Sequence, residues 1–341
     1  MKDEGLLNGL TAVLLTMTAV LSVGCAGDDE QGVPMNVSSV TRSGAAIPIG
    51  TSITTFLTKS SGEKRQGSVT KVGSDSWIST LAVNPGDTYY IYGFSPSDVV
   101  SSASDAELTT DVGYGSGATL TLRNVGSVLD KDLCVITGIQ DVTVDHKDDP
   151  PNIIEGQFRY LGKDIGMNYM NVLLSHLCST ISFTLKVNAT YNAMRTIKLK
   201  KLQLKSKTAE KYDITVVLTA NNSNTDPIES VTTSNAQGRQ ETATVYTNNI
   251  GLELTTTGNM EPIAGYFVFA PLIDLRVVST YDIYDTKGNL IRENCTAENK
   301  IPTPLNITDY GQRKTVNLTV NPTYLYMLSE PDLDNPTIVV E

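Results

Sequence analysis

The chain has 341 residues, 40% of them hydrophobic, so it can bury one large core or two ordinary ones once a leader is removed. Lysine and arginine number 26 against 37 aspartate and glutamate residues, which gives a formal net charge of −11. No run of basic residues is long enough to follow a phosphate backbone, so nucleic acid is not an expected partner. Recurring alternation of polar and apolar residues predicts antiparallel β-structure with one face in water.

An uncharged apolar stretch covers residues 5–24, near the upper length of a signal sequence and near the lower length of a membrane span. It ends in SVGC, which resembles the lipobox of bacterial lipoproteins, where a cysteine is lipidated and becomes the new N-terminus. Cys25 is therefore the predicted lipidation site. Ser22 occupies the position that is usually aliphatic, so an uncleaved anchor helix and an ordinary signal peptide remain the alternatives.

The N-terminal part of the chain then predicts a series of strands. Residues 34–41, PMNVSSVT, alternate as a first strand does, and the pattern breaks at Arg42. Residues 88–95 are rich in aromatic side chains and predict a strand that Pro96 ends. No helix of any length is predicted in this part.

One strand is predicted over residues 171–187, with apolar residues such as Ile181 and Phe183 on one face. His176 and Cys178 fall together on the other face. A catalytic pair or a metal site would need a further ligand or an orienting acid, which is not close in sequence but which the fold could bring near. A histidine with satisfied hydrogen bonds beside a small thiol is the favoured interpretation.

More strands follow, and residues 285–289, DTKGN, have the glycine and asparagine of a hairpin turn. The two sets of strands predict two β domains that meet near residue 168. Pro331 and Pro336 disfavour one continuous internal strand near the C-terminus.

Motifs for common catalytic and binding chemistry are missing. The sequence has no phosphate loop, no Gly-x-Ser-x-Gly elbow and no His-Glu-x-x-His, and the acidic residues 141–152 lack the spacing of a calcium loop. If Cys25 is lipidated, three cysteines remain, and an odd number cannot all pair within one chain. We therefore expect no enzyme, no cofactor, no metal site and no disulfide scaffold.

Several stretches, in their order and spacing, resemble the fimbrillin-like type V pilin family of Bacteroidetes. They include TRSGAAIPIGTSITTF, YYIYGFSP, LLSHLCSTISF, YDIYDTKGNLIREN and the terminal NPTYLYMLSEPDLDNPTIVVE. The resemblance implies an all-β fold with two β-sandwich domains in tandem, of transthyretin-like or Greek-key topology. The implied segments are a signal peptide 1–24, a lipidated propeptide 25–42 with the first strand, domains 43–168 and 169–341, and a donor-strand tail at about 322–341.

The resemblance also implies how the chain is processed and assembled. An arginine-specific protease cuts such pilins shortly beyond the first strand, and the bond between Arg42 and Ser43 matches that position. Arg65 is the competing site, although it lies in a charged segment without a good strand just ahead of it. The implied donor-strand residues are Leu325, Met327, Ile338 and Val340. An ordinary final strand is the alternative for the C-terminal segment.

The expected function is thus a structural fimbrial subunit that supports adhesion. Its expected partners are other pilin subunits joined head to tail, the protease, and the outer membrane through the lipid until cleavage releases it into an extracellular fimbrium. The alternative is a surface lipoprotein that binds glycans and does not polymerise. The single tryptophan, Trp77, offers little material for stacking on sugars, and Tyr89, Tyr90 and Tyr92 are more simply interpreted as strand residues.

Overall fold

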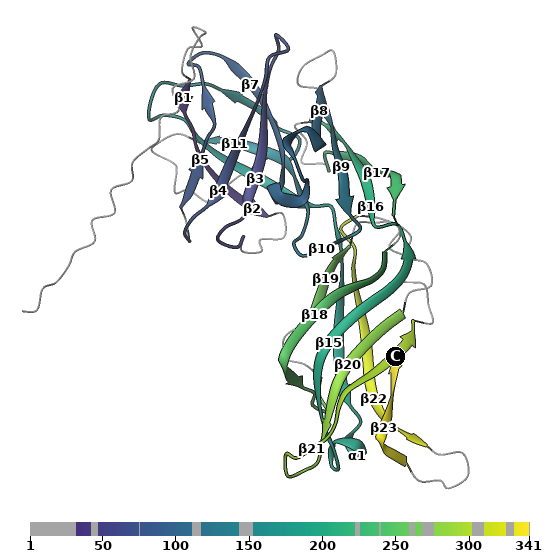
Figure 1. The fold of residues 1–341 in the computed structure, drawn as a ribbon. Coiled ribbons are helices and arrows are strands. Elements are labelled where there is room, and N and C mark those ends of the chain that lie inside the picture. The colour runs from purple at the N-terminus through teal and green to yellow at the C-terminus, as the bar shows by residue number, and fades with distance from the viewer. Residues whose placement is uncertain are drawn as a thin grey trace, which may run out of the picture. The chain divides into compact units, whose positions relative to one another are not determined.

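The computed structural model describes the chain between residues 32 and 340 in eleven stretches (Figure 1). These are residues 32–41, 47–74, 76–110, 117–142, 153–221, 226–238, 240–258, 263–267, 276–301, 310–324 and 331–340. Within them the predicted all-β class is confirmed, because the only helical elements are α1 (Ala189–Asn192), η1 (Ser97–Val99) and η2 (Ala103–Asp105). None of the helices in these stretches has the length and apolar character needed to cross a bilayer.

The largest sheet has eight strands in the path β2-β13-β11-β7-β3-β4-β5, with β12 paired to β7. Their bounds are β2 (Asn36–Thr41), β3 (Ser52–Lys59), β4 (Lys64–Lys71), β5 (Trp77–Ser79), β7 (Thr88–Ser95), β11 (Cys134–Val142), β12 (Arg159–Leu161) and β13 (Tyr169–His176). The middle strands are buried without a break, because apolar side chains lie on both faces. On β7, for example, Ile91 packs in one hydrophobic cluster and Phe94 in another.

Two small sheets contribute to these clusters. A two-stranded sheet of β1 (Val33–Pro34) and β6 (Ala82–Val83) adds Val83 to the cluster that contains Ile91. A four-stranded sheet in the order β17-β16-β9-β8 shares the cluster that contains Phe94. Its strands are β8 (Ala106–Thr110), β9 (Gly117–Gly126), β16 (Lys211–Thr219) and β17 (Ile228–Gln237).

A third hydrophobic cluster lies between the two remaining sheets. One has the order β10-β19-β14-β22-β23, and the other has the order β18-β15-β20-β21. The strands of the first are β10 (Val128–Leu129), β14 (Ser179–Val187), β19 (Ile263–Phe267), β22 (Arg313–Tyr324) and β23 (Pro331–Val340). Those of the second are β15 (Thr196–Thr208), β18 (Gln240–Glu253), β20 (Arg276–Tyr284) and β21 (Leu290–Lys300). β14 alternates strictly, with Ile181, Phe183 and Leu185 in the cluster, as predicted.

The predicted single strand over 171–187 is wrong. The structure has two strands there, β13 and β14, which belong to different sheets and are separated only by Leu177 and Cys178. The backbone N–H of Leu177 donates to the carbonyl of Leu133 at 2.7 Å, which fixes the point where the chain leaves the first sheet. Cys178 is buried in the cluster of Phe94 instead of lying on a polar face.

Backbone pairing crosses the boundary predicted near residue 168. β13 pairs with β11, β16 pairs with β9, and β19 pairs with β10, so strands from both sides of residue 168 share three sheets. The two-domain division stays a prediction, and any boundary must account for these shared sheets.

The predicted hairpin turn is confirmed between β20 and β21, which pair antiparallel. The Asp285 carboxylate accepts from the backbone N–H groups of Lys287 and Asn289, both at 2.8 Å. Gly288 has a φ of 84°, in the left-handed region that glycine adopts without strain. These contacts hold the carboxylate in its charged form and lower the pKa of Asp285, with the Asn289 side chain as the main cause.

Candidate assembly interface

The first candidate surface is the edge of the eight-stranded sheet, where β2 pairs in parallel with β13 (Figure 1). Val37 lies opposite Met170, and Thr41 lies opposite Leu174. Val37 of β2 and Met35, just before it, are only 6% and 2% exposed and belong to the cluster that contains Ile91. The alternation seen in the sequence therefore places apolar side chains of this strand in the core.

Removal of β2 would uncover an acceptor groove, which we define as the free edge of β13 with its residues Met170, Val172 and Leu174. These three side chains are at most 2% exposed while β2 is in place. The loss would also leave backbone N–H and C=O groups of β13 without partners. Burial of two side chains such as Met35 and Val37 contributes about 3–6 kcal/mol to the gross stability, so the groove favours a replacement strand.

The predicted cleavage residues Arg42 and Ser43 lie outside the described residues. Their position is still bracketed, because Thr41 is the last residue of β2 and Ile47 begins the next described stretch. The competing residue Arg65 lies inside β4, where its backbone pairs opposite Leu57 of β3. Proteases cut segments whose backbone is free of such ladders, so this pairing protects the bond after Arg65.

Other predicted positions also fall outside the described residues. Cys25, the predicted lipidation site, is one of them, and the donor-strand residues Leu325 and Met327 are two more. The acidic residues from 143 to 152 lie outside as well. Asp141 is described, and its carboxylate pairs with the Lys163 ammonium group.

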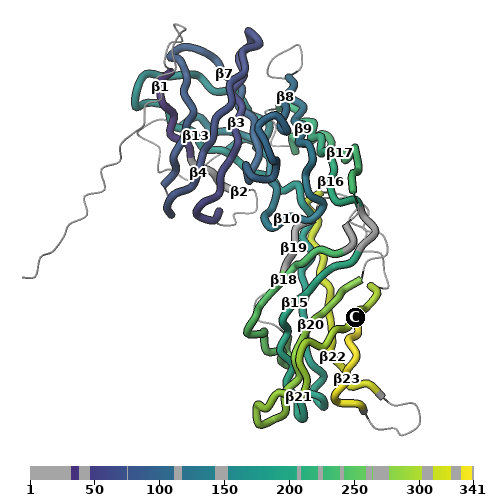
Figure 2. The backbone as a smooth tube through the Cα atoms, viewed as in Figure 1, coloured from purple at the N-terminus to yellow at the C-terminus, as the bar shows by residue number. Residues whose placement is uncertain are grey.

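The second candidate surface is the other terminal strand, β23, which forms the edge of the five-stranded sheet. It pairs antiparallel with β22, and the two strands run side by side in yellow in Figure 2. Ile338, one of the predicted donor-strand residues, is 3% exposed in the hydrophobic cluster of this sheet, whereas Val339 is 43% exposed. The backbone of Val340 lies opposite Leu318. In this chain the C-terminal segment is thus folded back on its own sheet.

The pairing of β23 is interrupted in the middle. Thr323 lies opposite Asp332, but Asn321 lies opposite Thr337, so a step of two residues on β22 corresponds to a step of five residues on β23. Pro336 lies in this interruption, and Pro331 is the first residue of the strand. Both are positions where the missing N–H of proline costs no ladder hydrogen bond. The segment is therefore an irregular edge strand, in keeping with the prediction drawn from its prolines.

Side chains from elsewhere hold the interrupted part of β23. Tyr191 of α1 donates its hydroxyl to the carbonyl of Leu333 at 2.7 Å. Burial raises the pKa of this tyrosine, so the hydroxyl stays a proton donor at neutral pH. Arg292 donates to the carbonyl of Asp334 at 3.0 Å, and Arg195 pairs with its carboxylate at 3.1 Å. This part of the strand is held by a few polar contacts in place of a continuous ladder.

The aromatic residues considered for sugar binding in the sequence lie in two strands of the eight-stranded sheet. Tyr89 and Tyr92 are buried in β7, and Tyr90 lies between them in the same strand, as predicted. Trp77 lies in β5 and has the ammonium group of Lys71 5.7 Å from the centre of its ring. These four residues are therefore explained by the strands in which they lie.

Comparisons with known proteins by sequence and by structure gave different results. No protein-family model matches the chain, and no curated protein matches it in sequence. Solved structures do match. A candidate cell adhesion protein of Bacteroides fragilis is 10% identical, with a TM-score of 0.45 over 92% of this chain and 94% of its own. A candidate cell adhesion protein of Bacteroides uniformis is 12% identical, with a TM-score of 0.42 over 92% and 98% of the two chains.

A fimbrial protein of Bacteroides vulgatus is 14% identical, with a TM-score of 0.37 over 92% of this chain and 98% of its own. The names of these three proteins agree with the resemblance to fimbrillin-like pilins found in the sequence. Because the identities are low and the TM-scores lie below 0.5, the function of this chain has to rest on its own residues.

Proposed function

We propose that the chain is a structural subunit of a surface fimbrium. It is exported as a lipoprotein through Cys25, activated by cleavage between Arg42 and Ser43, and polymerised when the C-terminal segment of one copy, residues 322–341, enters the acceptor groove of the next. The role is in adhesion and assembly, and no catalytic step is part of it.

One observation carries the proposal: β2, near the start of the described chain, and β23, at its end, are both edge strands. β2 pairs only with β13, and β23 pairs only with β22, in two different sheets. An edge strand can leave without breaking the interior of its sheet, and a strand from another chain can take its place. The donor and the acceptor are different surfaces of the same chain, so each added copy leaves one of each open and a fibre grows.

The energies are adequate for a durable contact. The predicted donor side chains are Leu325, Met327, Ile338 and Val340. If four or five such side chains are buried at about 1.5–3 kcal/mol each, the gross gain in free energy is about 10 kcal/mol. Ordering of the donor segment reduces this figure. The same segment must first leave its own sheet, where Ile338 is already buried, and this reduces the net gain further.

Cleavage also explains why the lipid is temporary. Residues 26–42 span at most about 56 Å at about 3.3 Å per residue, so the lipid on Cys25 holds the precursor near the outer membrane. One cut after Arg42 severs this tether and frees β2 from the rest of the chain.

The decisive experiment is digestion of the chain from Ala26 onward with an arginine-specific protease under native conditions. N-terminal sequencing and unheated denaturing electrophoresis then follow the products. We expect a new N-terminus at Ser43 together with a detergent-resistant ladder of oligomers. Arg42→Lys keeps the charge but removes the site, so both results should disappear, whereas the matched control Arg65→Lys should give the wild-type result.

Two outcomes would contradict the proposal. A chain cut at Arg42 that stays monomeric at high concentration would remove the polymerising role and favour a surface lipoprotein that binds glycans. A ladder that persists in Arg42→Lys and disappears in Arg65→Lys would place the activating cut inside β4.

A further inference from the structure

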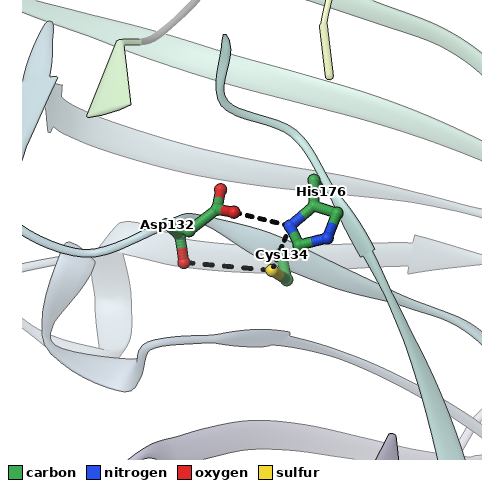
Figure 3. A group of neighbouring side chains, drawn as sticks. All are labelled: Asp132, Cys134 and His176. Atoms are coloured by element: carbon green, nitrogen blue, oxygen red, sulfur yellow. Dashed lines mark hydrogen bonds and ion pairs between the residues drawn. The ribbon is translucent and has the colours of Figure 1, made fainter. Parts of the chain in front are cut away.

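A cluster of three side chains with different chemistry lies at one end of the eight-stranded sheet. Cys134 is the first residue of β11, His176 is the last residue of β13, and the two lie directly opposite in the antiparallel register (Figure 3). Asp132 precedes Cys134 in the chain and turns its carboxylate toward the same imidazole. The fold thus supplies the acid that His176 lacks in its sequence neighbourhood, and it supplies Cys134 in place of Cys178 as the neighbouring thiol.

The three donor atoms converge on one another. The Sγ atom of Cys134 lies 3.6 Å from Nδ1 of His176, and Oδ2 of Asp132 lies 2.5 Å from the same nitrogen. All three donor atoms lie within 4.8 Å of one another. We call these residues the Asp-Cys-His cluster.

The cluster does not have the geometry of a catalytic triad. In a triad the nucleophile and the acid contact opposite nitrogens of the imidazole, so that the ring can pass a proton between them. Here the thiol and the carboxylate both contact Nδ1.

The distances suit a tetrahedral metal ion instead. Zinc with bonds of about 2.3 Å to sulfur and about 2.0–2.1 Å to nitrogen places those two ligand atoms about 3.6 Å apart, which is the observed separation of Sγ and Nδ1. The carboxylate oxygen would have to move from 2.5 Å to about 3.3 Å from Nδ1, a change within reach of side-chain rotation.

The carboxylate of Asp132 has a second feature that a cation would explain. Its other oxygen, Oδ1, is buried and has no hydrogen-bond partner in the structure. A buried carboxylate oxygen without a partner is costly, and such atoms in native proteins commonly mark the place of an ion or a water molecule.

An open cavity gives access to the cluster. It has a volume of about 730 Å³, and Asp132, Cys134 and His176 all line it. The acidic side chains of Asp130 and Asp132 and the basic side chains of Lys131 and Arg313 border the same cavity. Lys131 is engaged with Asp98 at 2.8 Å, which leaves the carboxylate of Asp132 to the cluster. A fourth ligand, water or a group from outside, can therefore approach from the cavity.

We propose that Asp132, Cys134 and His176 bind a zinc-type divalent ion with three protein ligands and a fourth position open to the cavity. The mixed sulfur, nitrogen and oxygen donors and the short mutual distances favour zinc over calcium or magnesium, which prefer oxygen ligands alone. The proposal departs from the expectation that the chain holds no metal, and it does not depend on polymerisation.

The test uses cobalt(II) as the spectroscopic probe and the full chain purified in detergent, with Cys25→Ser in every sample. Under reducing conditions we expect one equivalent of cobalt, with the visible bands of a tetrahedral site and a thiolate-to-cobalt charge-transfer band, both abolished by one equivalent of zinc. Cys134→Ser should lose the charge-transfer band. His176→Asn should weaken binding at least about 10-fold.

Cys295→Ser is the matched control, because it removes a free thiol on β21 outside the cluster and should leave the spectrum unchanged. If Cys134→Ser does not fold, as judged by circular dichroism, the wild-type spectrum and cobalt binding by His176→Asn test the proposal instead. Zinc should also raise the melting temperature of the wild type and not of His176→Asn, because only the folded site binds the ion. Failure of the wild type to bind one equivalent, or a charge-transfer band that persists in Cys134→Ser, would overturn the proposal.

Discussion

β2 and β23, near the two ends of the described chain, are both edge strands, but they are held in different ways. β2 has an unbroken parallel ladder along β13, and Val37 of this strand and Met35 just before it are buried in the core. β23 has an interrupted antiparallel ladder along β22, and its interrupted part depends on side-chain contacts from α1 and β21. β2 is held along its whole length by its ladder, whereas β23 is held by its ladder and Ile338 at one end and by polar side chains in the interrupted part.

This difference separates two kinds of release. β2 has no weak point along its ladder, so a cut in the chain is the natural way to free it. β23 can open locally at the interruption, because local opening costs least where ladder hydrogen bonds are missing. In the proposed function the proteolytic switch acts on β2 and the reversible movement belongs to β23.

The largest expected effect comes from placing a charge in the buried half of β23. Ile338→Asp would bury a carboxylate without a partner and should lower the free energy of unfolding by at least about 3 kcal/mol. It should also abolish the detergent-resistant ladder. The neighbouring Val339→Asp is the control, because that side chain is 43% exposed and a change there should stay within about 0.5 kcal/mol. Urea unfolding and electrophoresis measure the two readouts, and equal effects of both variants would refute the assigned register.

The next largest effect on stability is expected in the N-terminal segment that cleavage would remove. Met35→Ala should lower the free energy of unfolding of the uncut chain by about 2–5 kcal/mol, because it leaves a cavity in the core. After cleavage and separation of the peptide, the variant and the wild type should unfold identically, since the changed residue is gone. Asn36→Ala, at an exposed position of β2, is the control. A difference that survives cleavage would mean that β2 is not removed.

A smaller effect is expected from the tyrosine that holds the interrupted part of β23. Tyr191→Phe removes the hydrogen bond to the carbonyl of Leu333 and should ease local opening by about 1 kcal/mol. Hydrogen exchange of the β23 amides should then be about five-fold faster, with little change elsewhere. Tyr281→Phe, a buried tyrosine on β20, should not accelerate exchange in β23 selectively. Uniform acceleration across the sheet would contradict a local role.

The smallest effect belongs to the exposed ion pair. Asp334→Asn removes the contact with Arg195 and should change the stability of the tail by less than about 1 kcal/mol. Because salt screens exposed charges, the difference from the wild type should vanish in about 1 M salt. Hydrogen exchange of β23 at low and high salt measures this, and a salt-independent difference would show that the amide acts through its geometry.

The sequence predicted the half-buried strands well, and of the largely buried strands it predicted β7, which Pro96 ends, but not β13. In β14 the alternation of Ile181, Phe183 and Leu185 with polar residues gives both the strand and its buried face. In β13 both faces are buried, so the run lacks alternation, and no glycine or proline marks the break at Leu177 and Cys178. Two strands of different sheets were therefore predicted as one.

The side-chain clusters were beyond the sequence for a different reason. Cys134 meets His176 only because β11 and β13 pair in one particular register, and residues 42 positions apart give no local signal of that pairing. The edge position of β2 could be anticipated from its place before Arg42, but its parallel partner could not. The prolines of β23 did carry local information, because proline fits only at strand edges and interruptions.

The connection between β13 and β14 has a mechanical consequence. Only Leu177 and Cys178 separate a strand of the eight-stranded sheet from a strand of the five-stranded sheet, and both are buried. If a fibre of such subunits is pulled, tension entering β14 reaches β13 without any slack segment to absorb it. The load then falls on the interstrand hydrogen bonds of both sheets together, so a subunit under tension should resist extension until a sheet breaks.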